Sequence, residues 1–263
     1  MRSARTIAVA VLLIAADIAA SPLFGTKIPQ ARHRSGYSFM TPDTQAIQDD
    51  DTANPGMLWV LDGEALWKSK TGAADKACAD CHDDARASMK GVAARYPAFD
   101  STLGRPVDLE QRINLCRVQH QQATAIPYEH RDLLALTAFV ALQSRNAAIS
   151  PDVDPQLEPF VARGRDLFTQ RQGQLNLGCT NCHDDNWDKR LAGSAITQGH
   201  PTGYPLYRLE WQSLGSLQRR LRSCISGIRA KTYDYGAPEL VELELYLMSR
   251  ARGMPMEAPA VRP

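Results

Sequence analysis

The pattern Cys-x-x-Cys-His occurs twice in this chain of 263 residues, at 78–82 and again at 179–183. This pattern is the attachment signature of a c-type haem. The two cysteines form thioether bonds to the porphyrin, and the histidine that follows is one axial ligand of the iron. We therefore expect two covalently bound haem c groups. The predicted attachment residues are Cys78, Cys81 and His82 for the first haem, and Cys179, Cys182 and His183 for the second.

Other uses of paired cysteines explain these motifs less well. A four-cysteine zinc site would leave both histidines of the motifs without a role. A thioredoxin-like Cys-x-x-Cys is expected close to a βαβ pattern, and the sequence shows none. A protein with two c-type haems remains the favoured interpretation.

The residues around the two motifs repeat as well. At an offset of 101 residues, Gly63, Leu66 and Trp67 map onto Gly164, Leu167 and Phe168. At an offset of 108, Leu109, Arg112 and Cys116 map onto Leu217, Arg220 and Cys224. At an offset of 105, Ser144 and Arg145 map onto Ser249 and Arg250. Matching residues at such a period indicate repeated units, here an internal duplication.

The duplication predicts a mainly α fold made of two cytochrome c-like domains. Each domain is expected to hold an N-terminal helix, the haem motif, a middle helix with a third cysteine, and a C-terminal helix. Apolar residues at three- and four-residue spacing predict the C-terminal helices at Leu133–Leu142 and Leu240–Met248. A Pro- and Asp-rich stretch at Ser150–Pro159 is the expected linker.

The first twenty residues are typical of a secretory signal peptide. Arg2 and Arg5 precede an apolar run from Thr6 to Ala20, and small residues follow. An uncleaved membrane anchor is the alternative, but the run is short for a membrane span. We therefore predict a signal peptide at 1–20, a first haem domain at 21–150 and a second at 151–263. The mature chain is expected to have no membrane span and to lie in the periplasm, where bacterial haem attachment takes place.

Charge limits the choice of partners. The chain has a net charge of +1 and a pI near 7.6, so no strongly basic face is expected. Nucleic acid is therefore an unlikely partner.

Four thioethers leave Cys116 and Cys224 unused. In an oxidising compartment, a disulfide between them is one possibility. Their equivalent positions in the repeat favour instead the same role in each half, and the natural role is the second axial ligand of each iron. We therefore predict His82 and Cys116 as ligands of the first iron, and His183 and Cys224 as ligands of the second.

Methionine is the usual second ligand in electron-carrying cytochromes. None of the candidate methionines has a methionine at the equivalent repeat position, so we expect them to fill space; they are Met89, Met248, Met254 and Met256. The four remaining histidines also lack repeat partners, and we expect surface or structural roles for them; they are His33, His120, His130 and His200.

Thiolate ligation favours ferric iron and a low reduction potential, which suits a plain electron carrier poorly. Cysteine sulfur can also be persulfidated and can exchange with other sulfur species, so sulfur substrates are favoured. Arg112 and Arg220 each lie one helical turn before a third cysteine. A guanidinium lowers the pKa of a neighbouring thiol and can bind an oxyanion. The sequence around Cys224 is the more basic, so we favour substrate contact for Arg220 and an equal chance of a structural role for Arg112.

The chain resembles the SoxA family, the dihaem cytochrome c subunit of the SoxAX complex. The resemblance is carried by the segment Ser35–Trp59, both haem motifs, the two spare cysteines and the Arg-x-x-x-Cys pattern ending at Cys224. It implies an L-cysteine S-thiosulfotransferase, which couples thiosulfate to a cysteine of the carrier SoxYZ and releases two electrons. It also implies a small monohaem cytochrome partner similar to SoxX.

The resemblance further implies roles for individual residues. Cys224 is expected to be both the second ligand of the second haem and the persulfide-modified catalytic residue. Arg220 is expected to bind substrate. Arg250 is the nearest match for a second substrate-binding arginine, with Arg252 close by.

Two other classes of function stay open at this level. A dihaem electron-transfer cytochrome without catalytic activity would have methionine ligands and higher potentials. A dihaem peroxidase would need one iron site open to peroxide, and two ligating cysteines would close both sites.

Overall fold

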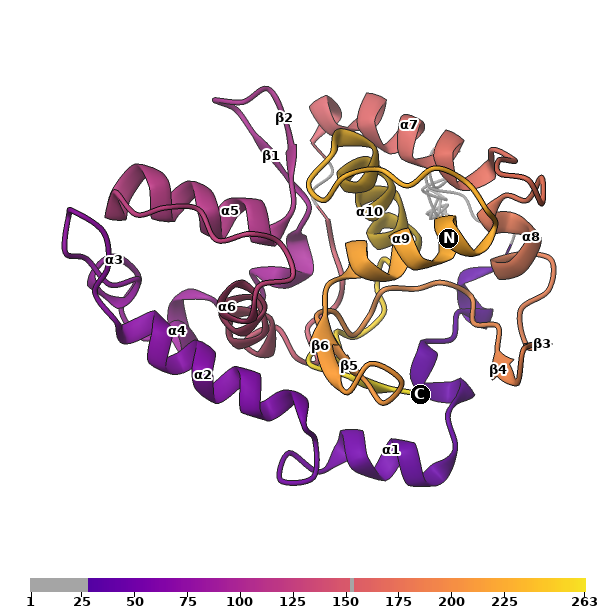
Figure 1. Cartoon of the computed structure of the whole chain (residues 1–263), viewed down its shortest axis with the longest axis horizontal. Helices are drawn as coiled ribbons and strands as arrows, with labels where there is room; N and C mark the ends of the chain where they lie inside the picture. The colour runs from indigo at the N-terminus through magenta and orange to yellow at the C-terminus, as the bar shows by residue number, and fades with distance from the viewer. Residues whose placement is uncertain (1–27, 152–153) are drawn as a thin grey trace, which may run out of the picture.

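Residues 28–151 and 154–263 are described by a computed structural model, and the predicted signal peptide lies outside them. The described part is mainly helical, as expected. It contains no helix that is both long and apolar enough to pass through a membrane. Two groups of helices lie on opposite sides of Figure 1, with β5 and β6 between them.

The first group follows the predicted order of elements. It consists of α2 (Gly56–Lys68), α3 (Ala79–His82), α4 (Ala85–Ser88), β1 (Ala98–Asp100), β2 (Arg105–Val107), α5 (Leu109–Cys116) and α6 (Arg131–Leu142). A π-helical turn at Arg117–Gln121 continues α5, and a 3-10 turn at Ala93–Arg95 precedes β1. The third cysteine of this half is therefore the last residue of its middle helix.

The second group repeats this order. It consists of α7 (Glu158–Thr169), α8 (Cys179–His183), β3 (Arg190–Leu191), β4 (Ser194–Ala195), β5 (Leu206–Arg208), β6 (Ser213–Gly215), α9 (Leu217–Gly227) and α10 (Pro238–Arg250). A 3-10 turn at Pro155–Leu157 leads into α7. Helix α7 begins at Glu158, so the last two residues of the predicted linker belong to the helix, whose first turn tolerates Pro159.

The repeated glycines let the first and last helices of each half cross closely. A Cβ atom on Gly63 would lie 2.1 Å from the carbonyl oxygen of Ala135 in α6. A Cβ atom on Gly164 would lie 2.0 Å from the carbonyl oxygen of Glu242 in α10. Because neither position has room for a side chain, glycine at both is a packing requirement that the duplication preserves.

This crossing also corrects the predicted offset in the last helix. Ala135 and Glu242 are equivalent at an offset of 107, two residues more than the predicted 105. Arg145 and Arg250 are accordingly in different environments. Arg145 makes an ion pair with Asp51 at 2.8 Å, whereas Arg250 is buried in the second half. The Ser-Arg match is therefore a coincidence of sequence at the end of two apolar helices.

A short hairpin precedes the middle helix in each half. The strands β1 and β2 pair with Ala98 opposite Val107, and β5 and β6 pair with Leu206 opposite Gly215. These pairs are equivalent at an offset of 108, the same offset as that of the middle helices. A polar side chain then caps each helix: Asp108 accepts from a backbone N–H in α5, and Ser216 does so in α9.

The described part has two hydrophobic cores. The first joins Trp67 and Phe139 of the first half with methionines from the second half and from the chain after α10. The second lies in the second half, mainly between α7 and α10. Met248, Met254 and Met256 are buried in the first core, and Met89 packs against it. The methionines therefore fill space, as predicted.

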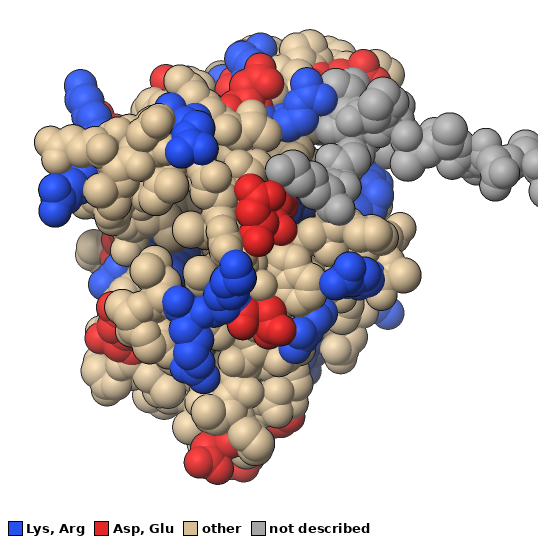
Figure 2. All heavy atoms as spheres, turned by 90° about the vertical axis from the view of Figure 1, so that its right-hand side faces the viewer, with Lys and Arg blue, Asp and Glu red and all other residues tan. Residues whose placement is uncertain are grey.

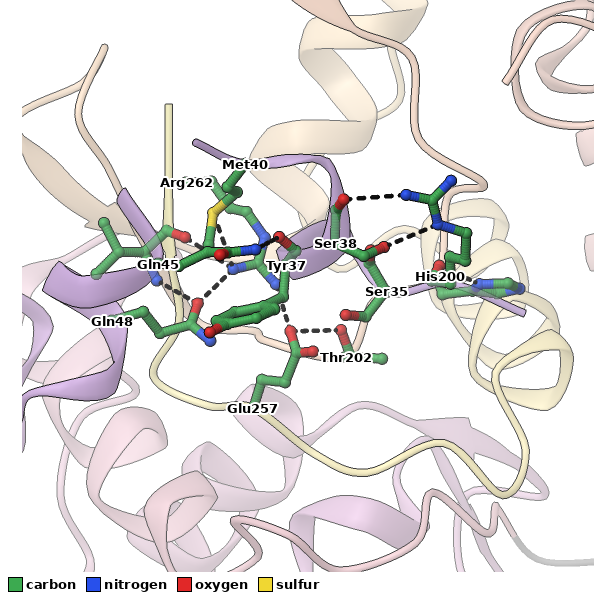
Figure 3. Close-up of polar contacts among 12 residues, drawn as sticks. Ser35, Tyr37, Ser38, Met40, Gln45, Gln48, His200, Thr202, Glu257 and Arg262 are labelled. Atoms are coloured by element: carbon green, nitrogen blue, oxygen red, sulfur yellow. Dashed lines mark hydrogen bonds and ion pairs between the residues drawn. The ribbon is translucent and has the colours of Figure 1, made fainter. Parts of the chain in front are cut away.

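The N-terminal segment packs against the second half. It holds 3-10 turns at Gln30–Arg32 and Gly36–Phe39 and helix α1 (Pro42–Asp49). Gln48 accepts a hydrogen bond of 3.1 Å from the backbone of Val261 in β7 (Val261–Arg262), which also pairs with β5 (Figure 3). Nδ1 of His200 lies 3.0 Å from the backbone oxygen of Arg34. The segment that resembles the opening of the SoxA chain thus packs against the last strand of the second half.

Charged side chains of both signs are mixed on one face of the molecule. Figure 2 shows Lys and Arg interspersed with Asp and Glu on the face that carries α8.

Candidate active site

The second haem motif lies on α8, a single helical turn held by its own side chains. The backbone N–H of Gly178 donates to Oδ1 of Asn181 at 2.9 Å. Nδ1 of His183 lies 2.7 Å from the carbonyl oxygen of Thr197. A carbonyl oxygen can only accept, so Nδ1 carries a proton, and Nε2 is the ring nitrogen left to face an iron. A histidine that ligates a metal commonly holds its other ring nitrogen in such a hydrogen bond.

Gly199 fits closely against the same ring. A Cβ atom at this position would lie 3.2 Å from Cγ and Nδ1 of His183, and the backbone has a φ of +73°. Both constraints favour glycine. The segment 197–199 therefore fixes the orientation of the His183 ring by contacting its Nδ1 side.

Cys224 faces this histidine from α9. Burial alone would raise the pKa of its thiol, but close contact with His183 and the positive charges of Arg220 and Arg208 outweigh burial and lower the pKa below its usual range. The other thiols of the motif behave differently, because burial raises the pKa of Cys179 to about 12 and also raises the pKa of Cys182. The thiolate form of Cys224 is therefore stabilised relative to the thiolate forms of Cys179 and Cys182.

Arg220 lies on the same face of α9, one turn before Cys224. Within residues 28–151 and 154–263, no carboxylate forms an ion pair with it. Its charge acts on Cys224, Arg208 and the buried phenol of Tyr204. An arginine without a counter-charge beside an activated thiol can bind an anionic substrate.

The first haem motif has the same framework and a different charge balance. Cys78 and Cys81 both lie close enough to Cys116 to interact electrostatically with it, and Nε2 of Gln121 lies 3.7 Å from Sγ of Cys78. Burial raises the pKa of Cys116 although Arg112 opposes the shift. His82 is exposed, with its ring 5.8 Å from that of Trp67.

Arg112 already has a partner. Its Nη2 donates to Oδ2 of Asp100 at 2.7 Å. The structural alternative for this arginine is therefore supported, and the partner is an aspartate of the preceding hairpin.

Arg250 lies in the interior of the second half. Its side chain is 1% exposed and donates to Oδ1 of Asp184 at 2.7 Å, and its guanidinium lies over the ring of Phe168. Because its charge is compensated by the residue that follows His183, the predicted role in substrate binding has less support for Arg250 than for Arg220. Arg252 donates to the carbonyl oxygen of Pro151 at 2.8 Å.

Both sites fit the covalent attachment of haem. All six cysteines are free thiols, so Cys116 and Cys224 are not joined to one another. In the second site His183 and Cys224 face each other, and together they are the donor pair of a His/Cys-ligated iron. Among the described residues, no three His, Cys, Asp or Glu side chains converge as a directly ligated metal ion would need.

Two repeated helical units, each with a haem-attachment motif close to a third cysteine, define a c-type cytochrome. The family model described as SoxA/TsdA, cytochrome c domain, matches the chain twice, at residues 62–149 and 163–256. The SoxA subunit from Pseudaminobacter salicylatoxidans is 38% identical over 229 residues, which is 87% of this chain and 80% of that protein. The SoxA subunit from Rhodovulum sulfidophilum matches to the same extent.

A solved structure gives the same result. The crystal structure of SoxXA from P. pantotrophus is similar with a TM-score of 0.85 and 30% sequence identity, over 88% of this chain and 87% of that one. The chain belongs to the SoxA family of L-cysteine S-thiosulfotransferase subunits, which are cytochromes with covalently bound haem c. The resemblance given by the motifs is confirmed.

Proposed function

We propose that this protein conjugates thiosulfate oxidatively to a cysteine of a SoxYZ-like carrier protein, with Cys224 as its catalytic residue. The observation that carries this proposal is the setting of that thiol. It is half-buried, its pKa is lowered by His183 and two arginines, and Arg220 beside it has no acidic partner among the described residues. A thiolate next to an uncompensated cation suits a sulfur anion as its reaction partner.

Two haem c groups would be held by the residues of the two sites. We assign Cys78, Cys81 and His82 with Cys116 to the first, and Cys179, Cys182 and His183 with Cys224 to the second. When bound, haem c supplies one-electron redox chemistry, so that the two electrons of the reaction leave in separate steps. The protein orients the reacting sulfur atoms and compensates their charge.

The reaction balances as an oxidation followed by an exchange. The thiolate sulfur of Cys224 and the outer sulfur of thiosulfate form an S–S bond, giving a cysteine S-thiosulfonate and two electrons. The thiolate of the carrier then attacks the sulfur that bears the sulfonate. The bond to Cys224 breaks, Cys224 leaves as a thiolate, and the carrier keeps the thiosulfonate group. Arg220 is positioned to bind the sulfonate oxygens in both steps.

The expected setting is the periplasm, with a SoxX-like monohaem cytochrome as the partner subunit. The structural relative is a SoxXA complex, and the short apolar run at residues 1–20 is typical of a signal peptide. The electrons are then expected to leave through that small cytochrome.

Replacing the two distal cysteines one at a time tests the proposal. Methionine keeps a sulfur ligand but removes the nucleophile. We expect Cys224→Met to lose conjugating activity by about four orders of magnitude or more, as loss of a nucleophile does in other enzymes. Cys116→Met is the matched control and should keep most of the activity. The measurement is formation of the carrier thiosulfonate by mass spectrometry, with haem absorption as the check on folding. Full activity in the Cys224 variant would remove this residue from the mechanism.

A further inference from the structure

The hairpins before α5 and α9 are equivalent residue for residue. Their third paired positions are Asp100 opposite Arg105 in the first half and Arg208 opposite Ser213 in the second. Asp100 and Arg208 are thus the same position of the duplicated unit, with opposite charges.

The two residues have opposite effects on the arginine that precedes the distal cysteine. In the first half, Asp100 neutralises Arg112 through the ion pair of 2.7 Å. In the second half, Arg208 lies near enough to Arg220 for their positive charges to interact, and both charges act on Cys224. Burial and then the charge of Arg220 lower the pKa of Arg208. Two guanidinium groups that repel each other at a partly buried site are stabilised when an anion joins them.

The residues around Arg208 hold its side chain in place but leave one of its N–H donors without an acceptor. Its side chain is 12% exposed, with Nη2 3.2 Å from Oε2 of Glu210 and the guanidinium over the ring of Trp211. Its Nε is buried and has no hydrogen-bond partner in the described part of the chain. A buried donor without an acceptor costs free energy unless a ligand supplies the acceptor.

We propose that Arg208 is a substrate-binding residue that works with Arg220 as a two-guanidinium site for the sulfonate end of the thiosulfate dianion, beside Cys224. This inference rests on the proposed function and adds a second arginine to it. A pair of planar guanidinium groups matches a group that carries three oxygens and most of the negative charge. The first half lacks the second guanidinium of such a site, because the equivalent of Arg208 is Asp100, which pairs with Arg112.

Substitutions at Arg208 test the site through the KM for thiosulfate in the holoenzyme with its small cytochrome and carrier. We expect Arg208→Gln to raise KM about tenfold or more and to change kcat less than about threefold. Arg208→Asp, which introduces the residue of the first half, should have the larger effect. Arg208→Lys keeps the charge and should recover most of the affinity.

Arg219→Gln is the matched control. Arg219 lies in α9 beside Arg220, and its guanidinium lies over the ring of Trp211, as that of Arg208 does, here at 4.2 Å. Unlike Arg208, it donates to the hydroxyl of Ser213 and forms an ion pair with Glu129. Removing this charge should leave KM within about twofold of the unmodified protein. Haem absorption and the thermal midpoint show that each variant is folded. An unchanged KM in folded Arg208→Gln, or an equal rise in Arg219→Gln, would overturn the inference.

Sulfate separates this inference from the proposed function. Sulfate is a dianion that lacks the reactive outer sulfur, and its binding can be measured by calorimetry without any turnover. We expect Arg208→Gln to weaken sulfate binding by the same factor as it raises KM. If the unmodified protein does not conjugate thiosulfate, the proposed function is wrong. The anion site is tested separately, because it is wrong only if Arg208→Gln leaves sulfate binding unchanged.

Discussion

The two halves of the molecule share a framework and differ in charge where the hairpin meets the middle helix. Three equivalent positions carry the difference. The pairs are Asp100 with Arg208, Asp108 with Ser216, and Glu110 with Gln218. The first half has three carboxylates at this corner, and the second half has none and gains an arginine. A duplicated fold has thus kept its packing while the electrostatic setting of one cysteine changed.

The distal cysteines respond to this difference. Burial opposes the thiolate form of both, and burial determines the result for Cys116, whose pKa is raised. At Cys224, contact with His183 and the positive charges of Arg220 and Arg208 reverse the result, and the pKa is lowered. The comparison indicates that the second site is built for reaction with an anion, whereas the first has its charges paired within the protein.

The largest expected effect separates the two equivalent arginines. Arg220→Gln should lower kcat/KM for thiosulfate by on the order of a hundredfold, because charged hydrogen bonds to the substrate are lost. Arg112→Gln should leave kcat/KM almost unchanged and lower the free energy of unfolding by about 1 kcal/mol, because Asp100 loses a partly exposed partner. Steady-state kinetics and urea unfolding measure the two quantities. An equal loss of activity in both variants would contradict the assignment of separate roles.

The glycines at the helix crossings should show how far the two halves remain alike. Gly63→Ala and Gly164→Ala each place a Cβ atom about 2 Å from a carbonyl oxygen of the crossing helix. We expect each variant to lose about 3 kcal/mol of stability, because the helices must separate. Gly227→Ala is the control, since nothing lies within 4 Å of its Cβ position in α9. Unfolding in urea gives the values, and a loss in one half only would show that the crossings are not equivalent.

Much of this framework could be predicted from the sequence because packing leaves a periodic trace. The first helix of each half follows from the match of Gly63 with Gly164, and the middle helices follow from the equivalence of Cys116 and Cys224. The last helices were found from apolar spacing, although their offset is 107 and not 105. These features depend on residue size and hydrophobicity, which repeat at regular intervals.

The charges at the site were harder to predict. Arg208 lies on a three-residue strand, which is too short to give a periodic signal, and its equivalence to Asp100 becomes visible only once both hairpins are paired. Extending the 108-residue offset backwards from the middle helices would have found it. Arg250 was the sequence-based choice for a second substrate arginine, and nothing local to it shows that Asp184 lies 2.7 Å away.

The smallest expected effect concerns the acidic corner of the first half and its dependence on pH. Glu110 is buried, and burial together with the charge of Asp108 raises its pKa to about 8. Its equivalent in the second half is Gln218, which donates to Oδ2 of Asp108 at 2.8 Å. The folded protein therefore favours the protonated form of Glu110, while the unfolded chain releases that proton near an ordinary pKa of 4.5.

This difference predicts a loss of stability as the pH rises. The contribution of Glu110 is fully present below about pH 4.5, falls through the interval up to about pH 8, and is constant above it. Each unit by which the pKa is raised costs about 1.4 kcal/mol once the proton is lost. Glu110→Gln gives this position the neutral side chain of the second half. The variant should gain stability relative to the unmodified protein between pH 5 and pH 8, by about 1 kcal/mol or more.

Urea unfolding at both pH values measures the gain as a difference of differences, which cancels the titration of the groups that do not interact with Glu110; its neighbours Asp108 and Glu244 belong to the measured effect. Glu158→Gln is the control, because Glu158 is exposed in the first turn of α7 and its substitution should not depend on pH in this range. A gain of equal size at pH 5 and pH 8 would show that Glu110 is ionised at both values. In that case Asp108 and Glu110 would be two ionised carboxylates buried side by side. The first half would then hold a surplus of negative charge, and the two halves would differ in how each compensates charge.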